Sequence, residues 1–311
     1  MSHVLVAGGA GFIGTSLCRR LLERGDEVVC VDNLVTGQQA SVATLSEHPA
    51  FRFVEADITE GIPVDGRLDA VVNLACPASP VDFEPLARQI LDAGSRGVAN
   101  LIDVAAAHGA RLLQASTSEV YGDPAVHPQP ETYLGNVDSL GVRGPYDESK
   151  RFAEALLMSE HRRGLDIGIV RIFNTYGPGM RARDGRVVTE FIHRALAGEA
   201  LEVHGDGTQT RSLCFVEDMV TGLLDVLASG EVGPINLGTD DEWRIADLAR
   251  LIVELCGSTS EVVHVPRPPR DPERRRPDLT RARALIGWAP ATSLRQGLIA
   301  TIDSYTSPPR R

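Results

Sequence analysis

The sequence predicts an α/β fold, a doubly wound parallel sheet of the Rossmann type with a smaller, interleaved C-terminal domain for substrate binding. Three observations lead to this expectation. Short apolar runs alternate with helical patterns through the first 173 residues, a glycine cluster follows the first run, and Asp32 ends the second. Strands that alternate with helices pair in parallel, because each helix carries the chain back to the end of the sheet where the strand began.

Six apolar runs have the length and composition of buried strands. They lie at residues 4–7, 28–31, 51–54, 70–74, 111–114 and 167–172. Helical patterns separate most of them, notably at residues 19–24, 87–108 and 149–163. Because buried parallel strands are apolar on both faces, such continuous runs indicate one sheet covered by helices on each side.

The alternation weakens after Asn174. Proline and glycine become frequent there, and residues 265–272 have the composition of an extended loop. We expect residues 1–173 to form the Rossmann domain and residues 174–311 mainly the smaller domain, with segments near 210–230 returning to the first.

Composition narrows the class of protein. The 311 residues are 43% hydrophobic and 23% charged, as in an ordinary globular protein. A net charge of −11 argues against nucleic acid or an anionic membrane as the main partner. Five cysteines without paired spacing suit free thiols in a reducing cytoplasm, and we expect neither a signal peptide nor a membrane span. The eight histidines show no H-x-x-x-H spacing, so we expect no metal.

Gly8, Gly11 and Gly14 follow the first apolar run with the spacing G-x-x-G-x-x-G. Glycines there permit a tight turn and let the backbone approach a pyrophosphate, which the following helix N-terminus attracts. Asp32, at the end of the second strand, suits hydrogen bonds from ribose hydroxyls and repels a 2′-phosphate, which favours NAD over NADP. The alternative is a glycine-rich turn in which Asp32 only caps a helix.

Lys150 is the only lysine, since the other 30 of the 31 lysine and arginine residues are arginine. It closes the pattern Tyr146-x-x-x-Lys150, which places both side chains on one helix face. An ammonium is a compact charge that lowers the pKa of a nearby phenol, and a planar guanidinium does not replace it in tight geometry. The pair indicates a tyrosine acid/base, and the alternative is an ordinary exposed pair on a helix.

With these motifs in place, the chain resembles an extended short-chain dehydrogenase/reductase and, within that superfamily, the UDP-glucuronic acid decarboxylase (UDP-xylose synthase) family. The resemblance covers nearly the whole chain. The glycine and Tyr/Lys motifs are common to the superfamily, whereas Thr117-Ser118-Glu119 and the Arg-Arg-Pro-Asp segment at 275–278 are more selective. Other matching segments are residues 77–80, 116–124, 131–133, 135–137, 141–143, 171–178, 184–188, 205–207 and 209–212.

The resemblance implies an NAD-dependent oxidation at C4 of UDP-glucuronic acid. Tyr146 would take the 4-hydroxyl proton, Lys150 would lower the Tyr146 pKa and hold the nicotinamide ribose, and Thr117 would hydrogen-bond the 4-oxygen. The resulting β-keto acid loses CO₂. Arg275 would stabilise the enolate or position the water that protonates C5, and Glu119 would orient the sugar or manage protons there. Reduction of the ketone by retained NADH would give UDP-xylose.

Each role has a structural alternative. Taken singly, Thr117 and Glu119 fit a polar strand end, and Arg275 fits a solvated basic loop. Their occurrence together with Tyr146 and Lys150 is what favours chemistry.

The resemblance also implies which residues hold the two ligands. Asn174 and Arg211 would bind the diphosphate. Val187 and Val188 would lie near the uracil and Gln209 near its ribose, although ordinary loop packing is the alternative. Further substrate contacts are implied for Pro77, Ser79 and Arg275. Cofactor contacts are implied for Gly8, Gly11, Phe12, Ile13, Gly14, Asp32, Asn33, Asp57, Ile58, Leu74, Ala75, Tyr146, Lys150 and Phe173.

Five positions depart from the family pattern. They are Phe83 and His204 where tyrosine is usual, Gly94 for asparagine, Gly179 for arginine, and Arg276 for lysine. We hypothesise that weaker retention of NADH or of the ketone lets the enzyme release some UDP-4-keto-xylose.

Three other functions compete. A sugar-nucleotide 4,6-dehydratase would need an acid at Ser118, and a serine cannot protonate a leaving hydroxyl as an aspartic acid does. A 4-epimerase would not need Glu119 or Arg275 in these places. A non-catalytic NAD-sensing protein would typically lose the Tyr/Lys pair.

The resemblance also implies a homodimer, because the helical patterns at 87–108 and 149–163 suit the four-helix dimer interface common in the superfamily.

Overall fold

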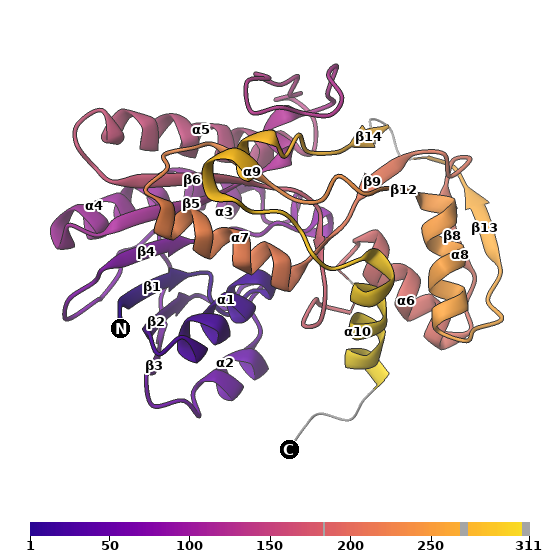
Figure 1. The fold of residues 1–311 in the computed structure, drawn as a ribbon, viewed down its shortest axis with the longest axis horizontal. Coiled ribbons are helices and arrows are strands. Elements are labelled where there is room, and N and C mark those ends of the chain that lie inside the picture. Colours follow the sequence, from indigo (N-terminus) through magenta and orange to yellow (C-terminus); the bar gives the residue numbers. More distant parts are fainter. Residues whose placement is uncertain (183, 268–272, 307–311) are drawn as a thin grey trace.

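The computed structural model of the protein, described here over residues 1–182, 184–267 and 273–306, has a central sheet of seven parallel strands. Their order is β11-β6-β5-β4-β1-β2-β3 (Figure 1). This confirms the doubly wound α/β fold and the six expected strands. β11 was not predicted, because three residues are too few for periodicity to reveal. The strands are β1 (His3–Ala7), β2 (Glu27–Asp32), β3 (Phe51–Glu55), β4 (Ala70–Asn73), β5 (Arg111–Thr117), β6 (Ile167–Ile172) and β11 (Ile235–Leu237).

Helices cover both faces of this sheet (Figure 1). On β1, Val4 and Val6 belong to one apolar core, whereas Leu5 and Ala7 belong to the other. The strand period of two thus places apolar side chains on both faces, as a parallel sheet requires. The first core is closed by α1 (Phe12–Glu23), α2 (Gln39–Leu45) and α7 (Val216–Ser229), the second by α4 (Val98–His108) and α5 (Gly144–His161).

The helix expected at residues 87–108 is interrupted. It consists of α3 (Ala87–Asp92), a π-helical segment η2 (Ala93–Gly97) and α4. A Cβ placed on Gly94 would lie 2.6 Å from the Cβ of Ser149 on α5, so the glycine lets the two helices touch. The wider π turn inserts a residue where this close contact is made.

The helix expected to begin at Ser149 begins earlier, at Gly144. Pro145 lies in its first turn, where the missing N–H costs nothing and the fixed φ suits a helix. Tyr146 therefore lies in the first turn of α5, on the same helix as Lys150, as the Tyr-x-x-x-Lys spacing predicts.

The smaller C-terminal part lies beside the sheet and has its own apolar core (Figure 1). Its helices are α6 (Val187–Ala197), α8 (Ile245–Leu255) and α10 (Leu294–Thr306). Its short sheets pair β8 (Leu201–His204) with β13 (Val262–Val265), and β9 (Thr210–Ser212) with β12 (Glu242–Arg244) and β14 (Arg274–Arg275). Residues 268–272 of the expected extended loop lie outside the described residues.

The chain crosses between the two parts more than once. β7 (Thr175–Tyr176) pairs in parallel with β10 (Cys214–Phe215) at the junction. α7 then packs on the large sheet and β11 joins its edge, and α9 (Thr280–Ile286) returns to the same side through Leu279 and Ala282. Within the described ranges, none of the helices is long and apolar enough to cross a bilayer.

Candidate active site

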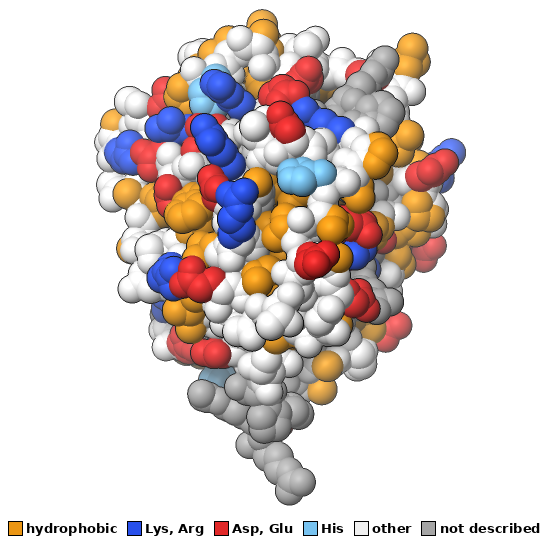
Figure 2. Space-filling view, turned by 90° about the vertical axis from the view of Figure 1, so that its right-hand side faces the viewer, with side chains coloured by type: hydrophobic (Ala, Val, Ile, Leu, Met, Phe, Trp, Pro, Cys, Tyr) orange, Lys and Arg blue, Asp and Glu red, His pale blue; other side chains and the backbone are white. Residues whose placement is uncertain are grey.

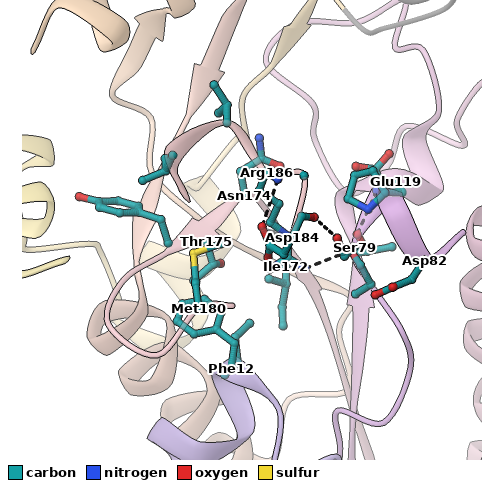
Figure 3. A pocket seen from close by; sticks show the side chains of 18 of the residues that line it. Phe12, Ser79, Asp82, Glu119, Ile172, Asn174, Thr175, Met180, Asp184 and Arg186 are labelled. Carbon is teal, nitrogen blue, oxygen red and sulfur yellow. Dashed lines mark hydrogen bonds and ion pairs between the residues drawn. The ribbon is translucent and has the colours of Figure 1, made fainter. Parts of the chain in front are cut away.

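A cavity of about 620 Å³ lies at the carboxyl ends of the central strands, facing the smaller part. β1 and β4 are neighbours whose following helices cover opposite faces, which is where open α/β sheets bind ligands. Figure 3 shows Ser79, Asp82 and Glu119 on one side of the view and Asp184 beside Ser79, whose hydroxyl donates to the Asp184 carbonyl.

Most of the expected site residues line this one cavity. They are Gly8, Gly11, Phe12, Ile13, Gly14, Leu74, Ser79, Thr117, Glu119, Tyr146, Lys150, Phe173, Asn174, Val187, Val188, Gln209, Arg211 and Arg275. Six expected residues lie outside its lining: Asp32, Asn33, Asp57, Ile58, Ala75 and Pro77.

The glycine turn has the geometry of a dinucleotide cradle. Gly8 has φ +78°, and a Cβ there would lie 2.6 Å from the backbone nitrogen of Ala75. Gly11 is the N-cap of α1, and no side chain caps the helix. The first N–H groups of α1 are thus open to a ligand beside the cavity, which fits the pyrophosphate of NAD.

Asp32 holds this turn in place. Its Oδ2 accepts a hydrogen bond from the Ala10 N–H at 3.0 Å, and its Oδ1 accepts one from the Leu34 N–H at 2.9 Å. Burial raises the pKa of Asp32, and these two N–H donors oppose that rise. Beyond it, the Asn33 amide donates to Asp57 Oδ2 at 2.9 Å. These residues form a polar group next to the turn but outside the cavity.

Tyr146 and Lys150 lie side by side, and both are buried. The Lys150 Nζ is 5.8 Å from the centre of the Tyr146 ring and donates to the Ala115 carbonyl at 3.0 Å. Phe83 stacks on the phenol, with ring centres 4.7 Å apart and 18° between planes. Thr117 hydrogen-bonds the phenol. The expected catalytic group is therefore assembled.

The direction of the Tyr146 pKa differs from the expectation. Burial, followed by the neighbouring Cys76 thiol, raises the pKa of the phenol, and the hydrogen bond with Thr117 only partly opposes this. The Lys150 ammonium is directed to a carbonyl rather than to the phenol oxygen. Desolvation of the ring therefore outweighs the stabilising charge in this structure.

Glu119 lies between two arginines. It belongs to the 3₁₀ turn η3 (Ser118–Tyr121) that ends β5, and its carboxylate forms ion pairs with Arg275 and with Arg143. Arg275 reaches it from β14 and also donates to the Gly122 carbonyl at 3.1 Å. Burial would raise the pKa of Glu119, but the charges of Arg275 and Arg143 lower it overall. Arg275 is thus a buried partner of Glu119 and not part of a solvated loop.

Two members of this cluster were not predicted. Arg143 precedes α5, pairs with Glu119 and lies 5.3 Å from the centre of the Phe83 ring. Asp147 follows Tyr146, is 4% exposed, and its Oδ1 has no hydrogen-bond partner. Arg143 belongs to one of the segments that carry the resemblance, but no role was predicted for it. Asp147 lies between Tyr146 and Lys150, at a position whose identity the Tyr-x-x-x-Lys pattern does not specify.

The opposite wall presents the groups expected around a nucleotide. Val187 and Val188 begin α6. The Gln209 amide donates to the His204 carbonyl at 2.7 Å, and Arg211 donates to the Thr210 carbonyl at 2.8 Å. All but Thr210 line the cavity.

Contacts join the two walls above the cavity. The Ser79 hydroxyl donates to the Asp184 carbonyl, and Arg186 donates to the Ala78 carbonyl at 3.1 Å. Arg181 pairs with Asp82 at 2.5 Å. On the face shown in Figure 2, basic side chains lie among acidic and apolar ones.

Three of the positions that depart from the family pattern make contacts that the structure describes. Phe83 supplies the ring that stacks on Tyr146. Gly94 packs on Ser149, and Gly179 has φ +91° and accepts a hydrogen bond from Gln38 at 2.9 Å.

Comparison with known proteins identifies the family of the chain. The profile of the "NAD dependent epimerase/dehydratase family" matches residues 4–238. UDP-glucuronic acid decarboxylase 5 of Arabidopsis thaliana is 46% identical over 95% of this chain and 87% of its own length. UDP-glucuronic acid decarboxylase 1 of Danio rerio is 42% identical over 98% of this chain and 72% of its own.

Solved structures show the same fold. A UDP-glucose 4-epimerase of Thermotoga maritima has a TM-score of 0.88 at 29% identity, covering 97% of this chain and 98% of that one. A dTDP-glucose 4,6-dehydratase of Streptomyces venezuelae, solved with NAD, has a TM-score of 0.86 at 28% identity, covering 97% and 96%. The chain belongs to the NAD-dependent epimerase/dehydratase family of extended short-chain dehydrogenases/reductases, and its sequence places it beside the UDP-glucuronic acid decarboxylases.

Proposed function

We propose that this protein is an NAD-dependent UDP-glucuronate decarboxylase that forms UDP-xylose through a 4-keto intermediate. One observation carries the proposal: Glu119, held by Arg275, lines the same cavity as Tyr146 and Lys150. A site for oxidation at C4 alone would not need this ion pair. NAD would be held by the glycine turn and would accept the C4 hydride and later return it.

Tyr146 exchanges a proton with the 4-oxygen. Thr117 hydrogen-bonds the phenol and both residues line the cavity, so we place the 4-oxygen next to these two hydroxyls. The Phe83 ring fixes the plane of the phenol by stacking. Lys150 supplies a positive charge 5.8 Å from the centre of the ring.

Arg275 and Glu119 act at the neighbouring carbon. Once C4 is a ketone, the C5 carboxylate can leave as CO₂, and its electrons form an enolate. The buried Arg275 guanidinium stabilises that negative charge, and Glu119 keeps the guanidinium in place. The Arg143 contact holds Glu119 from its other oxygen.

The residues proposed to hold the cofactor and the nucleotide follow from the family resemblance. Asp32 and Asn33 would bind the adenosine ribose, and the further residues that would contact the cofactor are Asp57, Ile58, Leu74, Ala75 and Phe173. Asn174 and Arg211 hold the diphosphate, and Val187, Val188 and Gln209 hold the uridine. Residues 1–173, with α7 and β11, form the cofactor domain, and most of residues 174–311 form the nucleotide-sugar domain.

The test is incubation of the purified protein with UDP-glucuronic acid and NAD, following products by mass and nicotinamide absorbance. Loss of CO₂ to give UDP-xylose without NADH build-up supports the proposal. A 4-keto pentose with accumulating NADH supports decarboxylation with release before the final reduction. No reaction rejects UDP-glucuronic acid as substrate and favours the epimerase or dehydratase alternatives.

We also propose a homodimer that works in the cytoplasm. Leu91 on α3 and Phe152 on α5 are 41% and 51% exposed and line one surface depression, which suits a helical interface. Sedimentation should give twice the chain mass, and Phe152→Glu should lower it toward the monomer. The buried thiols of Cys18, Cys30 and Cys214 fit a reducing compartment, which localisation of the tagged protein in its host would check.

A further inference from the structure

Arg143 lines the same cavity as Tyr146, yet the mechanism above uses it only to hold Glu119. It is the residue just before α5, and its side chain is 36% exposed. Apart from the bond to Glu119, the Arg143 side chain makes no hydrogen bond with the residues that the structure describes. Its remaining N–H donors are therefore available to a ligand in the cavity.

The Phe83 ring orients this guanidinium. The Cζ of Arg143 lies over the ring, 5.3 Å from its centre, and the same ring stacks on Tyr146. A cation–π contact orients a guanidinium without occupying a hydrogen-bond acceptor, so the N–H donors stay free. An arginine with free donors binds a carboxylate through two parallel hydrogen bonds, which a neutral hydroxyl cannot match.

The charges around Arg143 also favour an anion. Arg143 and Arg275 share the single carboxylate of Glu119, which leaves one positive charge uncompensated. Asp147 also acts on Arg143, but burial raises the pKa of Asp147 to about 7, so it is only partly ionised at neutral pH. A ligand carboxylate beside Arg143 would complete the charge balance.

Arg275 is less suited to receive that carboxylate. Its side chain is 6% exposed, and its two terminal nitrogens already donate to Glu119 and to the Gly122 carbonyl. In the proposed reaction the 4-oxygen lies next to Tyr146, and the carboxylate is carried by the neighbouring C5. One aromatic ring separates Arg143 from that phenol, which places the guanidinium on the side of the cluster that a ligand can reach.

We propose that Arg143 binds the C5 carboxylate of UDP-glucuronic acid and sets the preference of the site for a uronic acid over a neutral sugar. The contact is made before the reaction and is lost when the carboxylate leaves as neutral CO₂. Arg143 therefore acts on substrate affinity, while Arg275 acts on the enolate that remains. This assignment deepens the proposed decarboxylase function and rests on it.

Binding and turnover test the two proposals separately. With NADH bound in place of NAD, C4 cannot be oxidised, so calorimetry measures the affinity for UDP-glucuronic acid without reaction. The wild-type protein should bind it at least about 10-fold more tightly than UDP-glucose, which has a CH₂OH group in place of the carboxylate. Equal affinities overturn the inference. A clear preference without CO₂ release in the presence of NAD supports carboxylate binding and rejects only the decarboxylase function.

Arg143→Gln removes the charge and the planar fork. We expect the preference for UDP-glucuronic acid over UDP-glucose to fall by about 10- to 100-fold, while the Kd for UDP-glucose stays within about twofold. Arg143→Lys keeps a charge beside Glu119 and should retain part of the preference, with a fall of about 3- to 10-fold. It also decides the question if the glutamine variant does not fold.

Arg194→Gln is the matched control. Arg194 lines the same cavity and pairs with Glu202 at 3.1 Å, so its loss should leave the preference as in wild type. An equal loss of affinity for both UDP-sugars in the Arg143 variants would mean that Arg143 only supports Glu119, and would overturn the inference. An undiminished preference in those variants would overturn it as well.

Discussion

The glycine turn and the Glu119 cluster border the same cavity but are built in different ways. The turn is made of backbone from one short segment, with Gly8 pressed against the backbone of Ala75. The cluster is made of side chains that the fold collects from η3, α5 and β14. The turn depends on shape, so we expect an added carbon at Gly8 to disrupt it. The cluster depends on charge balance, so we expect it to tolerate paired changes.

The largest effect should come from adding one carbon to the turn. Gly8→Ala places a Cβ 2.6 Å from the Ala75 nitrogen at φ +78°, so the turn must open and the pyrophosphate loses its N–H donors. We expect the Kd for NAD, measured by calorimetry, to rise by at least about 100-fold, because several charge-assisted hydrogen bonds are lost.

Gly25→Ala is the matched control. Gly25 has φ +82° but nothing within 4 Å of an added Cβ, so this variant meets only the backbone strain, about 1 kcal/mol. Its affinity for NAD should be unchanged. Equal effects of the two variants on NAD affinity would show that close packing at Gly8 is not what shapes the site.

A charge-cluster variant should have the next largest effect. Glu119→Gln leaves Arg275 buried without its carboxylate, which costs about 3–5 kcal/mol in the free energy of unfolding and stops CO₂ release. Arg275→Gln should cost less, because Arg143 still neutralises Glu119. The double variant should be more stable than the sum of the singles predicts, as measured by urea unfolding.

The exposed pair Arg295–Glu254, at 2.8 Å and with both side chains more than half exposed, serves as the comparison cycle. It should show a coupling of about 0–1 kcal/mol. If Glu119 and Arg275 couple no more strongly than this surface pair, the cluster is not held by its charges.

The difference between the turn and the cluster also explains which features could be predicted from the sequence. Gly8, Gly11, Gly14 and Asp32 lie on consecutive elements, so spacing alone predicts a turn that the fold then forms. The six long strands were predicted for the same reason, since period and apolarity are local properties. β11 and the π-helical turn at η2 were not, because one is too short and the other follows from contact between Gly94 and Ser149.

Charge clusters escape sequence reasoning for a physical reason. The nearness of Asp147 to Glu119 and Arg275 depends on how β14 pairs with β9 beside the end of β5, and no local pattern encodes that register. The Tyr146 pKa was expected to be lowered by Lys150, but the extent of burial, which opposes the lowering, belongs to the folded chain.

The two acids of the cluster should give opposite pH signatures of stability, a smaller effect. Glu119, whose folded pKa is lowered, stabilises the fold above its unfolded pKa of about 4.3 and loses this as the pH falls through the folded value. Asp147, whose pKa is raised to about 7, destabilises the fold increasingly as the pH rises from about 4 to about 7. Asp147→Asn should therefore gain unfolding free energy relative to wild type between about pH 5 and about pH 8, whereas the deficit of Glu119→Gln should stay constant. A gain for Asp147→Asn that does not change with pH would contradict the raised pKa.

The smallest effect should come from a change at Phe83, which contacts both Tyr146 and Arg143. Its ring stacks on Tyr146, and Arg143 lies over it, so it contacts both the Tyr146 phenol and the charge cluster without a hydroxyl of its own. Phe83→Tyr keeps the stack and adds one hydrogen bond, worth about 0.5–1.5 kcal/mol, near the sugar. If a missing hydroxyl weakens retention of the ketone, the share of UDP-4-keto-xylose among the products should fall by about 2- to 10-fold. Phe152→Tyr, on the exposed face of α5, should leave that share unchanged. An unchanged share in both variants would mean that the hydroxyl is not what retains the intermediate, and that the ring acts through stacking alone.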